Sequence, residues 1–366
     1  MATPLRLGVV GANPSIGWAS RTHVPGLLAL PDYDLAAVCT TKRESAEAAA
    51  QKYEARKAYW DYRDLVSDPD IDVVDVCVRV PYHFEIVKAA LAAGKHVYCE
   101  WPLAATTAQA EELATLASKA GVHAMVGLQA RAAPSWIHLR ELIADGWLGR
   151  IITATMTQYS GGLLQPRAPE ATWRLDRANG AHTLSISAGH AIDAFTWALG
   201  QLSRVSAIVD TLAPDVPLQD GGSIRATAPD HVAVHGRFED GGIATIDVSS
   251  VPWHPSGFRL EVYGTDGTIV GSASQAQATG IRLQGARKGE QRLTDVPIPA
   301  DLRWVPPEVP DGTPFNVAQM FRRFADGIRE GSHPAPTFDD AVRNHRFLDS
   351  IERASREGRS VPITAQ

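Results

Sequence analysis

The sequence contains no run of about 18 apolar residues, the length that a membrane-spanning helix requires. It also has no long stretch of one charge sign, and its net charge of −6 argues against the concentrated basic face of a nucleic-acid-binding protein. Cysteine is scarce: Cys39, Cys77 and Cys99 form no C-x-x-C pair and lie in apolar runs. We therefore expect reduced core thiols and no structural metal. The first residues lack the regions of a signal peptide, so we expect a cytoplasmic protein.

The chain is long enough, and apolar enough, for two domains. It has 366 residues, of which 45% are hydrophobic and 21% are charged, an ordinary composition for a globular protein. Domains of roughly 100–200 residues would divide such a chain in two. The pattern of apolar residues changes beyond residue 125, so we predict domains at 1–125 and 126–366.

The first domain is predicted to be a doubly wound α/β fold. Its strand-like runs are apolar almost throughout, as in parallel strands that helices cover on both faces. Gly94 and Gly121 follow two helical patterns at positions where a helix C-terminus favours glycine. This alternation is typical of a dinucleotide-binding domain. The expected strands are 5–10, 34–40, 73–80, 96–100 and 123–129, and the expected helices are 18–29, 44–53, 83–93 and 107–120.

The second domain is predicted to be an α+β fold with an antiparallel sheet. Polar and apolar residues alternate along its strands, which indicates a sheet covered on one face. The segment 297–314 is rich in proline and is expected to cross the surface in an extended form. The expected strands are 150–160, 204–212, 231–239, 242–250, 259–271 and 281–286, and the expected helices are 135–145, 184–199, 317–330 and 338–357.

The stretch "VVGANPSIGW" after the first strand looks like an irregular phosphate-binding turn. A dinucleotide-binding loop reads G-x-G-x-x-G, whereas here Asn13 takes the place of the second glycine and Gly17 comes one residue late. Because asparagine tolerates a positive φ, we expect Asn13 to replace glycine in part, and Ser15 to offer its hydroxyl to a phosphate oxygen. We interpret the turn as a cofactor site at a helix N-terminus. The alternative is an ordinary strand-to-helix connection without a ligand.

The end of the second strand predicts the form of the cofactor. In the dinucleotide fold an acidic residue at this place binds the ribose 2′-hydroxyl, but this chain has Thr40, followed by the cations Lys42 and Arg43. Two cations without a carboxylate tolerate a 2′-phosphate, so NADP(H) is favoured over NAD(H). The alternative is that the two cations are only the solvated start of a helix.

The run "AGKHVYCEWPLA", residues 93–104, resembles the signature G-K-H-V-x-x-E-K-P-L-A of the Gfo/Idh/MocA family of sugar and polyol oxidoreductases. Further motifs extend the resemblance over nearly the whole chain: "LQARAAPSWIHLRELIADGWLGRI", "TWRLDRANGA", "GHAID" and "LEVYGTDGTIV". The resemblance implies a Rossmann domain followed by a large, mostly antiparallel open sheet. It implies hydride transfer between NAD(P) and a sugar, polyol or related hydroxy or keto compound. It also implies a homo-oligomer, a dimer or tetramer, formed through the outer face of the sheet.

His190 is the candidate base for this reaction. It matches the family histidine in "GHAID", and an imidazole with an unperturbed pKa of about 6.5 suits proton transfer at neutral pH. Two family positions differ, because Trp101 replaces the lysine of E-K-P and Ile186 replaces an aspartate four residues before the histidine. Trp101 has no titratable group near neutral pH and cannot assist proton transfer. The alternative for His190 is a structural histidine that Asp193, three residues later, satisfies.

The remaining candidate residues come from the matching motifs. Trp101 either lies along the nicotinamide or the sugar, or only fills the space of the missing lysine. The Trp101-Pro102 bond favours the cis form, and the resemblance implies a bend of the chain there. Trp173 and Arg174 either bind the sugar or serve packing. The candidate substrate-binding residues, three of which (His182, Tyr159 and Arg131) could replace the lysine, are Trp101, Arg131, Tyr159, Trp173, Arg174, His182 and Asp193. The candidate cofactor-binding residues are Gly11, Asn13, Ser15, Ile16, Thr40, Thr41, Lys42, Arg43, Arg79, Glu100 and Gln129.

The pair E-W, the irregular turn and the retained G-H-x-x-D together resemble one branch of the family, that of the fungal galactose-regulon repressor. The resemblance implies the oxidoreductase fold and dinucleotide binding, with the output of a sensor that contacts a transcription activator. A non-catalytic nucleotide- and sugar-binding sensor is therefore the alternative function. A scaffolding protein with an empty cleft is a third reading.

Overall fold

The computed structural model describes residues 3–363 and divides them into two compact units. The first unit runs to Ala132 and also includes Arg303–Val342, whereas the second comprises Ala133–Leu302 and the residues from Arg343 onward. The predicted division at residue 125 assigned all later residues to the second domain. The prediction did not foresee that residues 303–342 return to the first unit. They do so because the helix in this segment has apolar side chains, among them Phe321 and Phe324, that complete the core of the first unit.

The first unit contains a six-stranded parallel sheet in the order β3-β2-β1-β4-β5-β6, so the predicted doubly wound fold is confirmed. The strand order reverses between β1 and β4, and ligands of such sheets bind at the carboxyl ends of the strands at this point. The sequence did not predict β3, a half-buried strand of three residues at the edge. The strands are β1 Leu5–Val10, β2 Tyr33–Cys39, β3 Lys57–Tyr59, β4 Val73–Val76, β5 His96–Glu100 and β6 Ala124–Gly127.

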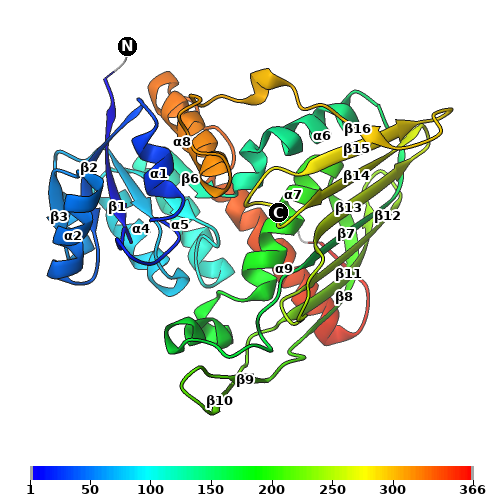
Figure 1. The fold of residues 1–366 in the computed structure, drawn as a ribbon, viewed down its shortest axis with the longest axis horizontal. Helices are drawn as coiled ribbons and strands as arrows, with labels where there is room; N and C mark the ends of the chain where they lie inside the picture. Colours follow the sequence, from blue (N-terminus) through cyan, green and yellow to red (C-terminus); the bar gives the residue numbers. More distant parts are fainter. Residues whose placement is uncertain (1–2, 364–366) are drawn as a thin grey trace. The chain divides into compact units, whose positions relative to one another are not determined.

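Helices cover both faces of this sheet, and the late helix α8 packs beside α1 (Figure 1). All three cysteines of the chain are buried and free, as expected. The predicted helix 18–29 is largely wrong, because α1 has only six residues. The helices are α1 His23–Leu28, α2 Arg43–Tyr53, α3 Tyr62–Ser67, α4 His83–Ala92, α5 Thr107–Ala120 and α8 Thr313–Glu330, with the short turns η1 Val80–Tyr82 and η2 Gln129–Ala132.

The second unit contains a nine-stranded sheet in the order β16-β15-β14-β13-β7-β12-β11-β8-β17. It is mostly antiparallel, as predicted, but β12 and β7 pair in parallel. A separate hairpin pairs β9 with β10. The strands are β7 Ile151–Tyr159, β8 Leu202–Asp210, β9 Asp215–Pro217, β10 Ser223–Arg225, β11 His231–Phe238, β12 Ile243–Ser249, β13 Gly257–Gly264, β14 Gly267–Ala273, β15 Arg282–Arg287, β16 Thr294–Asp295 and β17 Val361–Pro362.

One face of this sheet is covered by helices (Figure 1). Burial alternates along β7, where Ala154, Met156 and Gln158 are buried, and Gln158 Nε2 donates to the carbonyl of Ser187 in η5 at 3.0 Å. The predicted helix 184–199 divides into a turn of π type, η5, and α7. The helical segments are α6 Pro134–Ala144, η3 Pro169–Leu175, η4 Arg177–Asn179, η5 Thr183–Ala188, α7 Gly189–Leu199, η6 Ala300–Leu302 and α9 Phe338–Glu357.

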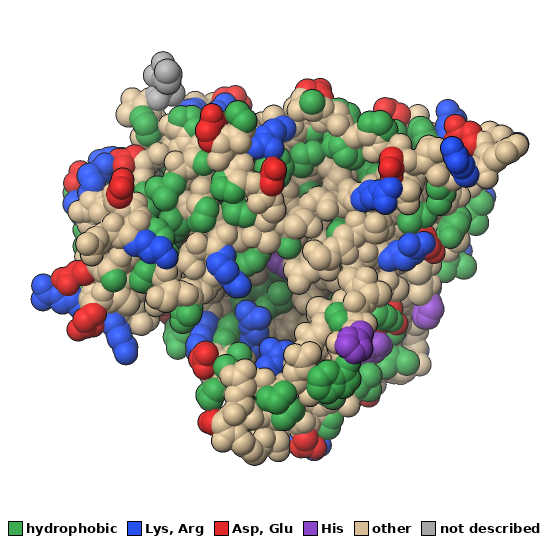
Figure 2. Space-filling model, viewed as in Figure 1, with side chains coloured by type: hydrophobic (Ala, Val, Ile, Leu, Met, Phe, Trp, Pro, Cys, Tyr) green, Lys and Arg blue, Asp and Glu red, His purple; other side chains and the backbone are tan. Residues whose placement is uncertain are grey.

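The surface carries mixed charge. On the face shown in Figure 2, acidic and basic side chains are interspersed, and neither sign covers the face as a whole. Among the helices of the described residues, none combines the length and apolarity that crossing a bilayer demands.

Candidate functional site

The phosphate turn starts where β1 ends. Gly11 has a φ of +108°, and a Cβ there would lie 2.1 Å from the carbonyl oxygen of the residue after β4, so only glycine fits. Asn13 Oδ1 accepts hydrogen bonds from the backbone N–H groups of Ser15 at 2.9 Å and Ile16 at 3.2 Å. The expectation that Asn13 takes a positive φ is wrong, because Glu54 is the one non-glycine residue with a positive φ in the described chain. Asn13 instead orders the turn through its side chain.

The loop between this turn and α1 is held by side chains that bond to backbone carbonyls. Thr22 Oγ1 donates to Trp18 O at 2.7 Å, and Arg21 Nε donates to Gly17 O at 3.1 Å. Such bonds compete with helix formation, which explains why the predicted helix is short. Gly17 has a φ of +110° and open space where a Cβ would be. The turn after β1 therefore continues into a loop and does not lead directly into a helix N-terminus, since α1 begins at His23.

The end of β2 is arranged around Thr40. Its Oγ1 hydrogen-bonds to Ser45 Oγ at 2.6 Å and to the carbonyl of Lys42 at 3.0 Å, which fixes the start of α2. Arg43 Nε donates to Glu47 Oε1 at 2.8 Å, so its charge is partly compensated on the helix surface. Lys42 is exposed and forms no ion pair with the described residues, and the neighbouring Thr41 is exposed too. Of the two predicted cations, Lys42 is the one that an added anion can pair with directly.

A buried polar cluster lies within the first unit at the carboxyl ends of β4 and β5. His23, the first residue of α1, is fully buried; its Nδ1 lies 2.8 Å from Asp75 Oδ2 and its Nε2 lies 2.8 Å from Glu100 Oε1. Gln129 Nε2 donates to both carboxylate oxygens of Glu100, at 2.7 and 3.0 Å. The structure thus brings together two predicted cofactor-binding residues, Glu100 and Gln129, and adds two that the sequence did not single out.

The two ring nitrogens of His23 both face carboxylate oxygens, which only accept when ionised. Burial disfavours the charged ring, but the Asp75 carboxylate outweighs it, and the pKa of His23 is raised well above its usual value. Burial likewise raises the pKa of Glu100, although the hydrogen bond from His23 opposes this effect. We conclude that His23 is an imidazolium that fixes the position of Glu100.

Three further predicted residues of the first unit have ordinary environments. Trp101 is 4% exposed and precedes a cis bond to Pro102, so the predicted bend is present, and its burial fits the interpretation that the indole fills space. Arg131 Nη1 donates to Asp340 Oδ1 at 2.9 Å, and this ion pair makes it a poor replacement for the missing lysine. Arg79 is exposed and precedes η1.

In the second unit, His190 lies in the first turn of α7 and is 6% exposed. Its Nδ1 is buried and has no hydrogen-bond partner among the described residues. Burial lowers the pKa of His190 to about 3, and no carboxylate opposes the shift. The alternative in which Asp193 satisfies this histidine is therefore wrong, although Asp193 is buried on the same helix. His190 is a neutral imidazole at pH 7.

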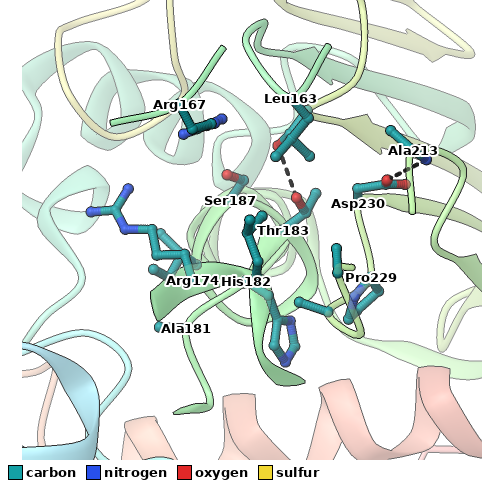
Figure 3. A pocket seen from close by; sticks show the side chains of 15 residues that line it. Leu163, Arg167, Arg174, Ala181, His182, Thr183, Ser187, Ala213, Pro229 and Asp230 are labelled. Carbon is teal, nitrogen blue, oxygen red and sulfur yellow. Dashed lines mark hydrogen bonds between the residues drawn. The ribbon is translucent and has the colours of Figure 1, made fainter. Parts of the chain in front are cut away.

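A pocket in the second unit contains other predicted residues (Figure 3). Arg174 from η3 and His182 before η5 line it, and so does Ile186, which replaces the family aspartate. Burial lowers the pKa of His182 to about 4, with a smaller effect from the positive charge of Arg177. Because His182 Nδ1 accepts from Ser185 N–H at 3.4 Å, the single proton of the neutral ring is on Nε2.

Two of the predicted substrate-binding residues are placed elsewhere. Tyr159 is the last residue of β7, adjacent to Gln158, whose side chain reaches η5. Successive residues of a strand point to opposite faces, so Tyr159 lies on the face of the sheet that η5 does not cover. Trp173 does not line the pocket; Arg174 lies 5.5 Å from its ring centre.

The pocket also holds polar residues that the sequence did not single out. They are Arg167, Thr183, Ser187, Asp230 and Ser250. Segments separated by many residues meet here only in the folded chain, and none of these residues belongs to a motif with recognisable spacing. The sequence did not predict His23 and Asp75 as site residues either, because neither belongs to a motif. His23 lies in a helix of six residues, and Asp75 lies in an apolar strand.

Comparison with known proteins identifies related families and structures. Residues 5–128 match the model "Oxidoreductase family, NAD-binding Rossmann fold", and residues 136–270 match the "GFO/IDH/MocA C-terminal domain". The chain is 30% identical to 1,5-anhydro-D-fructose reductase of Ensifer adhaerens over 364 residues, which cover 98% of each chain. It is 28% identical to the galactose/lactose metabolism regulatory protein GAL80 of Saccharomyces cerevisiae over 308 residues, 77% of this chain and 70% of that protein.

A solved structure is similar over the whole length. It is levoglucosan dehydrogenase in complex with NADH and levoglucosan, which superimposes with a TM-score of 0.85 at 25% identity and covers 99% of this chain and 100% of that chain.

Proposed function

The chain belongs to the Gfo/Idh/MocA family of oxidoreductases, and within it we propose a dehydrogenase or reductase of a sugar or polyol that uses His190 for proton transfer. The chain is an NAD(P)-dependent oxidoreductase that acts on CH–OH groups, as the sequence predicted. The observation that carries the sugar assignment is similarity over 98% of the chain to an anhydrosugar reductase. A solved relative also holds NADH together with levoglucosan.

The residues of the first unit fit a dinucleotide. The sheet reverses its strand order beside β1, Gly11 allows the chain to turn sharply there, and Gly17 leaves open space in the loop. Ser15 and Ile16 are exposed on this loop, although their N–H groups already bond to Asn13. At the other end of the site, Glu100 is the residue that His23 and Gln129 hold in place, and we assign it to the nicotinamide-proximal part of the cofactor.

A bound nicotinamide supplies the hydride donor or acceptor. The task of the protein is then to accept or return the hydroxyl proton, and His190 is neutral and able to do so. Its Nδ1 is sealed from solvent, so a substrate hydroxyl meets the ring at Nε2. Trp101 leaves no second titratable group at the family lysine position. We therefore expect His190 to carry the proton without that assistant.

Three finer points belong to the same proposal. NADP(H) is preferred, because Lys42 is an exposed cation without an ion pair among the described residues beside a ribose site that lacks a carboxylate. The protein is a cytoplasmic homo-oligomer, a dimer or tetramer. Exposed isoleucines on the face of the sheet that the helices leave open, Ile208 (64% exposed) and Ile243 (49%), favour pairing of that face with a second copy.

A sensor is the second candidate function. It is favoured by the similarity to GAL80, by the tryptophan in place of the family lysine, and by the phosphate-turn amides that Asn13 occupies. In this case the protein binds a nucleotide and a sugar without turnover.

The deciding experiment is a nicotinamide absorbance assay of the purified protein with NADP⁺ or NADPH across aldoses, polyols, anhydrosugars and their keto forms. Turnover that disappears in His190→Asn supports the dehydrogenase. Cofactor binding by fluorescence without turnover of any compound supports the sensor.

A further inference from the structure

Arg167 lines the pocket of the second unit, and its guanidinium group lacks hydrogen-bond partners among the described residues. It is half-buried, its Nε is sealed from solvent, and its guanidinium group has no hydrogen bond or ion pair with any residue from 3 to 363. Burial lowers the pKa of Arg167, and no carboxylate contributes to compensate. Since an arginine stays charged in a protein, the pocket contains a positive charge that the chain does not neutralise.

The backbone holds this guanidinium in a defined place. Arg167 N–H donates to Pro217 O at 2.8 Å, and Arg167 O accepts from Gln219 N–H at 2.9 Å, so β9 and its turn fix the segment. A side chain on Gly162 would place its Cβ 3.3 Å from Arg167 Nη2, so the glycine leaves room for the guanidinium. Near this segment, Leu163 and Val216 belong to a small cluster of buried apolar residues. Backbone hydrogen bonds thus fix the segment that carries Arg167, and Gly162 leaves space for its guanidinium group.

Other donors line the same side of the pocket. In Figure 3, Arg167, Arg174 and Ser187 lie on one side, and Asp230 lies on the other. The hydroxyl of Ser187 makes no hydrogen bond within the described part of the chain. The Asp230 carboxylate is buried and already accepts from the N–H groups of Leu212 and Ala213, at 2.8 Å each. This side of the pocket therefore carries the uncompensated charge of Arg167 and offers further hydrogen-bond donors.

We propose that this pocket binds an oxyanion, the carboxylate or phosphate group of an acidic sugar, through Arg167, Arg174 and the hydroxyl of Ser187. The planar fork of a guanidinium matches both oxyanions and gains most when it is partly shielded from water. A neutral sugar hydroxyl would leave the charge of Arg167 uncompensated. This assignment rests on the proposed function for the identity of the ligand as a sugar, and it makes the substrate a sugar acid or a sugar phosphate.

The test is isothermal titration of the full-length protein with D-glucuronate, D-glucose 6-phosphate and D-glucose, at low and at high salt. One or both of the acidic sugars bind, their affinity falls as salt rises, and D-glucose binds much more weakly. Arg167→Ala weakens acidic-sugar binding roughly 10- to 100-fold, as expected for the loss of a charge-assisted hydrogen bond. Arg167→Lys recovers part of the affinity because it keeps the charge without the fork. The two acidic ligands distinguish a carboxylate site from a phosphate site.

Arg225→Ala is the matched control. Arg225 lies on β10, the strand that pairs with β9, where it is exposed and forms an ion pair with Asp215. It does not line the pocket, so its removal leaves the affinity for acidic sugars unchanged. Thermal denaturation of each variant shows whether it is folded, and Ser187→Ala provides a second, milder change in the same pocket.

The proposal is overturned if D-glucose binds as tightly as the acidic sugars, or if folded Arg167→Ala binds them as the Arg225→Ala control does. It is also overturned if neutral sugars are turned over with NADP⁺ while acidic ones neither bind nor react, a result that leaves the dehydrogenase assignment intact. If acidic sugars bind through Arg167 and are never turned over, the result supports the proposed oxyanion site and contradicts the proposed dehydrogenase function.

Discussion

Two buried histidines, one in each unit, have opposite protonation states. His23 is fully buried and places each ring nitrogen 2.8 Å from a carboxylate oxygen. His190 is buried to a similar degree, but its Nδ1 has no partner among the described residues. Burial disfavours the charged form of both rings, and at His23 the negative charge of Asp75 outweighs burial and raises the pKa.

The difference separates a structural role from a chemical one. An imidazolium between two carboxylates is held in place by both and has no free nitrogen for a substrate. A neutral imidazole without a partner on Nδ1 contributes little to the fold and keeps Nε2 for a ligand. The motif histidine is therefore the reactive candidate, and the histidine outside any motif supports the site.

The largest expected effect is on turnover by the His190→Asn variant. Loss of the proton acceptor should reduce kcat by roughly 10²- to 10⁴-fold, whereas substrate binding and stability change little. Steady-state kinetics with NADP⁺ and a turned-over sugar measure this effect. His345→Asn is the control, since His345 is another buried histidine, with a pKa lowered to about 4 by burial, that is not assigned to the chemistry. Equal kcat for His190→Asn and wild type would remove His190 from the mechanism.

The His23→Ala variant should instead lose stability. Removing the imidazolium leaves Asp75 and Glu100 buried without their shared partner, and breaking such a buried pair destabilises a protein by about 3–5 kcal/mol. Denaturant unfolding of the purified variant gives the free energy. His235→Ala, at an exposed position on β11, should be neutral. An unchanged midpoint for His23→Ala would show that the cluster does not stabilise the first unit.

The pH dependence of stability should have opposite sign for the two kinds of histidine. His182, His190 and His345 have folded pKa values lowered to about 4, 3 and 4, so their contribution is present above pH 6.5 and is lost as pH falls towards these values. The contribution of each histidine to the free energy of unfolding falls by on the order of 2 kcal/mol by about pH 5, when the pKa shift is converted to free energy.

The raised pKa of His23 has the reverse consequence: its contribution is complete below pH 6.5 and is lost as pH rises through the folded value. Unfolding free energies of wild type and His190→Asn, measured between pH 5 and pH 7 as a series, check the sign for the histidines with lowered pKa values. A loss of wild-type stability as pH rises above 7 checks the sign for His23. A stability curve that His190→Asn leaves equally steep on the acid side would contradict the low pKa of His190.

The smallest expected effect concerns the cofactor. Lys42→Ala should weaken NADPH roughly 3- to 10-fold and leave NADH nearly unchanged, because the lost pair is an exposed one. Arg43→Ala should change the affinities for NADPH and NADH by less than Lys42→Ala changes the affinity for NADPH, since Arg43 already donates to Glu47 at 2.8 Å. Fluorescence titration with each cofactor measures the difference. If Lys42→Ala weakens NADH and NADPH by the same factor, the lysine does not read the 2′-phosphate.

Much of the fold follows from local patterns of apolar residues. The parallel strands β1 and β5, the helices α5 and α9 and the strands β7, β11, β12 and β15 match the predicted segments closely. Such elements are long or strongly periodic, and their burial in one core makes periodicity informative. The predicted strand 259–271 divides into the antiparallel strands β13 and β14, and β9, β10, β16 and β17 were not predicted. The short elements β3 and α3 were missed because few residues carry their pattern. Within the candidate site, motif spacing in the sequence marked His190, Glu100 and the substitution at Trp101 as candidate positions.

The protonation of the histidines and the charge of the pocket depend on contacts that form only in the folded chain. Whether an imidazole is charged depends on which carboxylates fold against it, and His23, Asp75 and Glu100 come from distant parts of the chain. The same holds for Arg167, whose lack of an acceptor is visible only once β9 and η5 surround it. Sequence patterns encode which residues are buried, but the electrostatic state of a buried group is set by its neighbours in space.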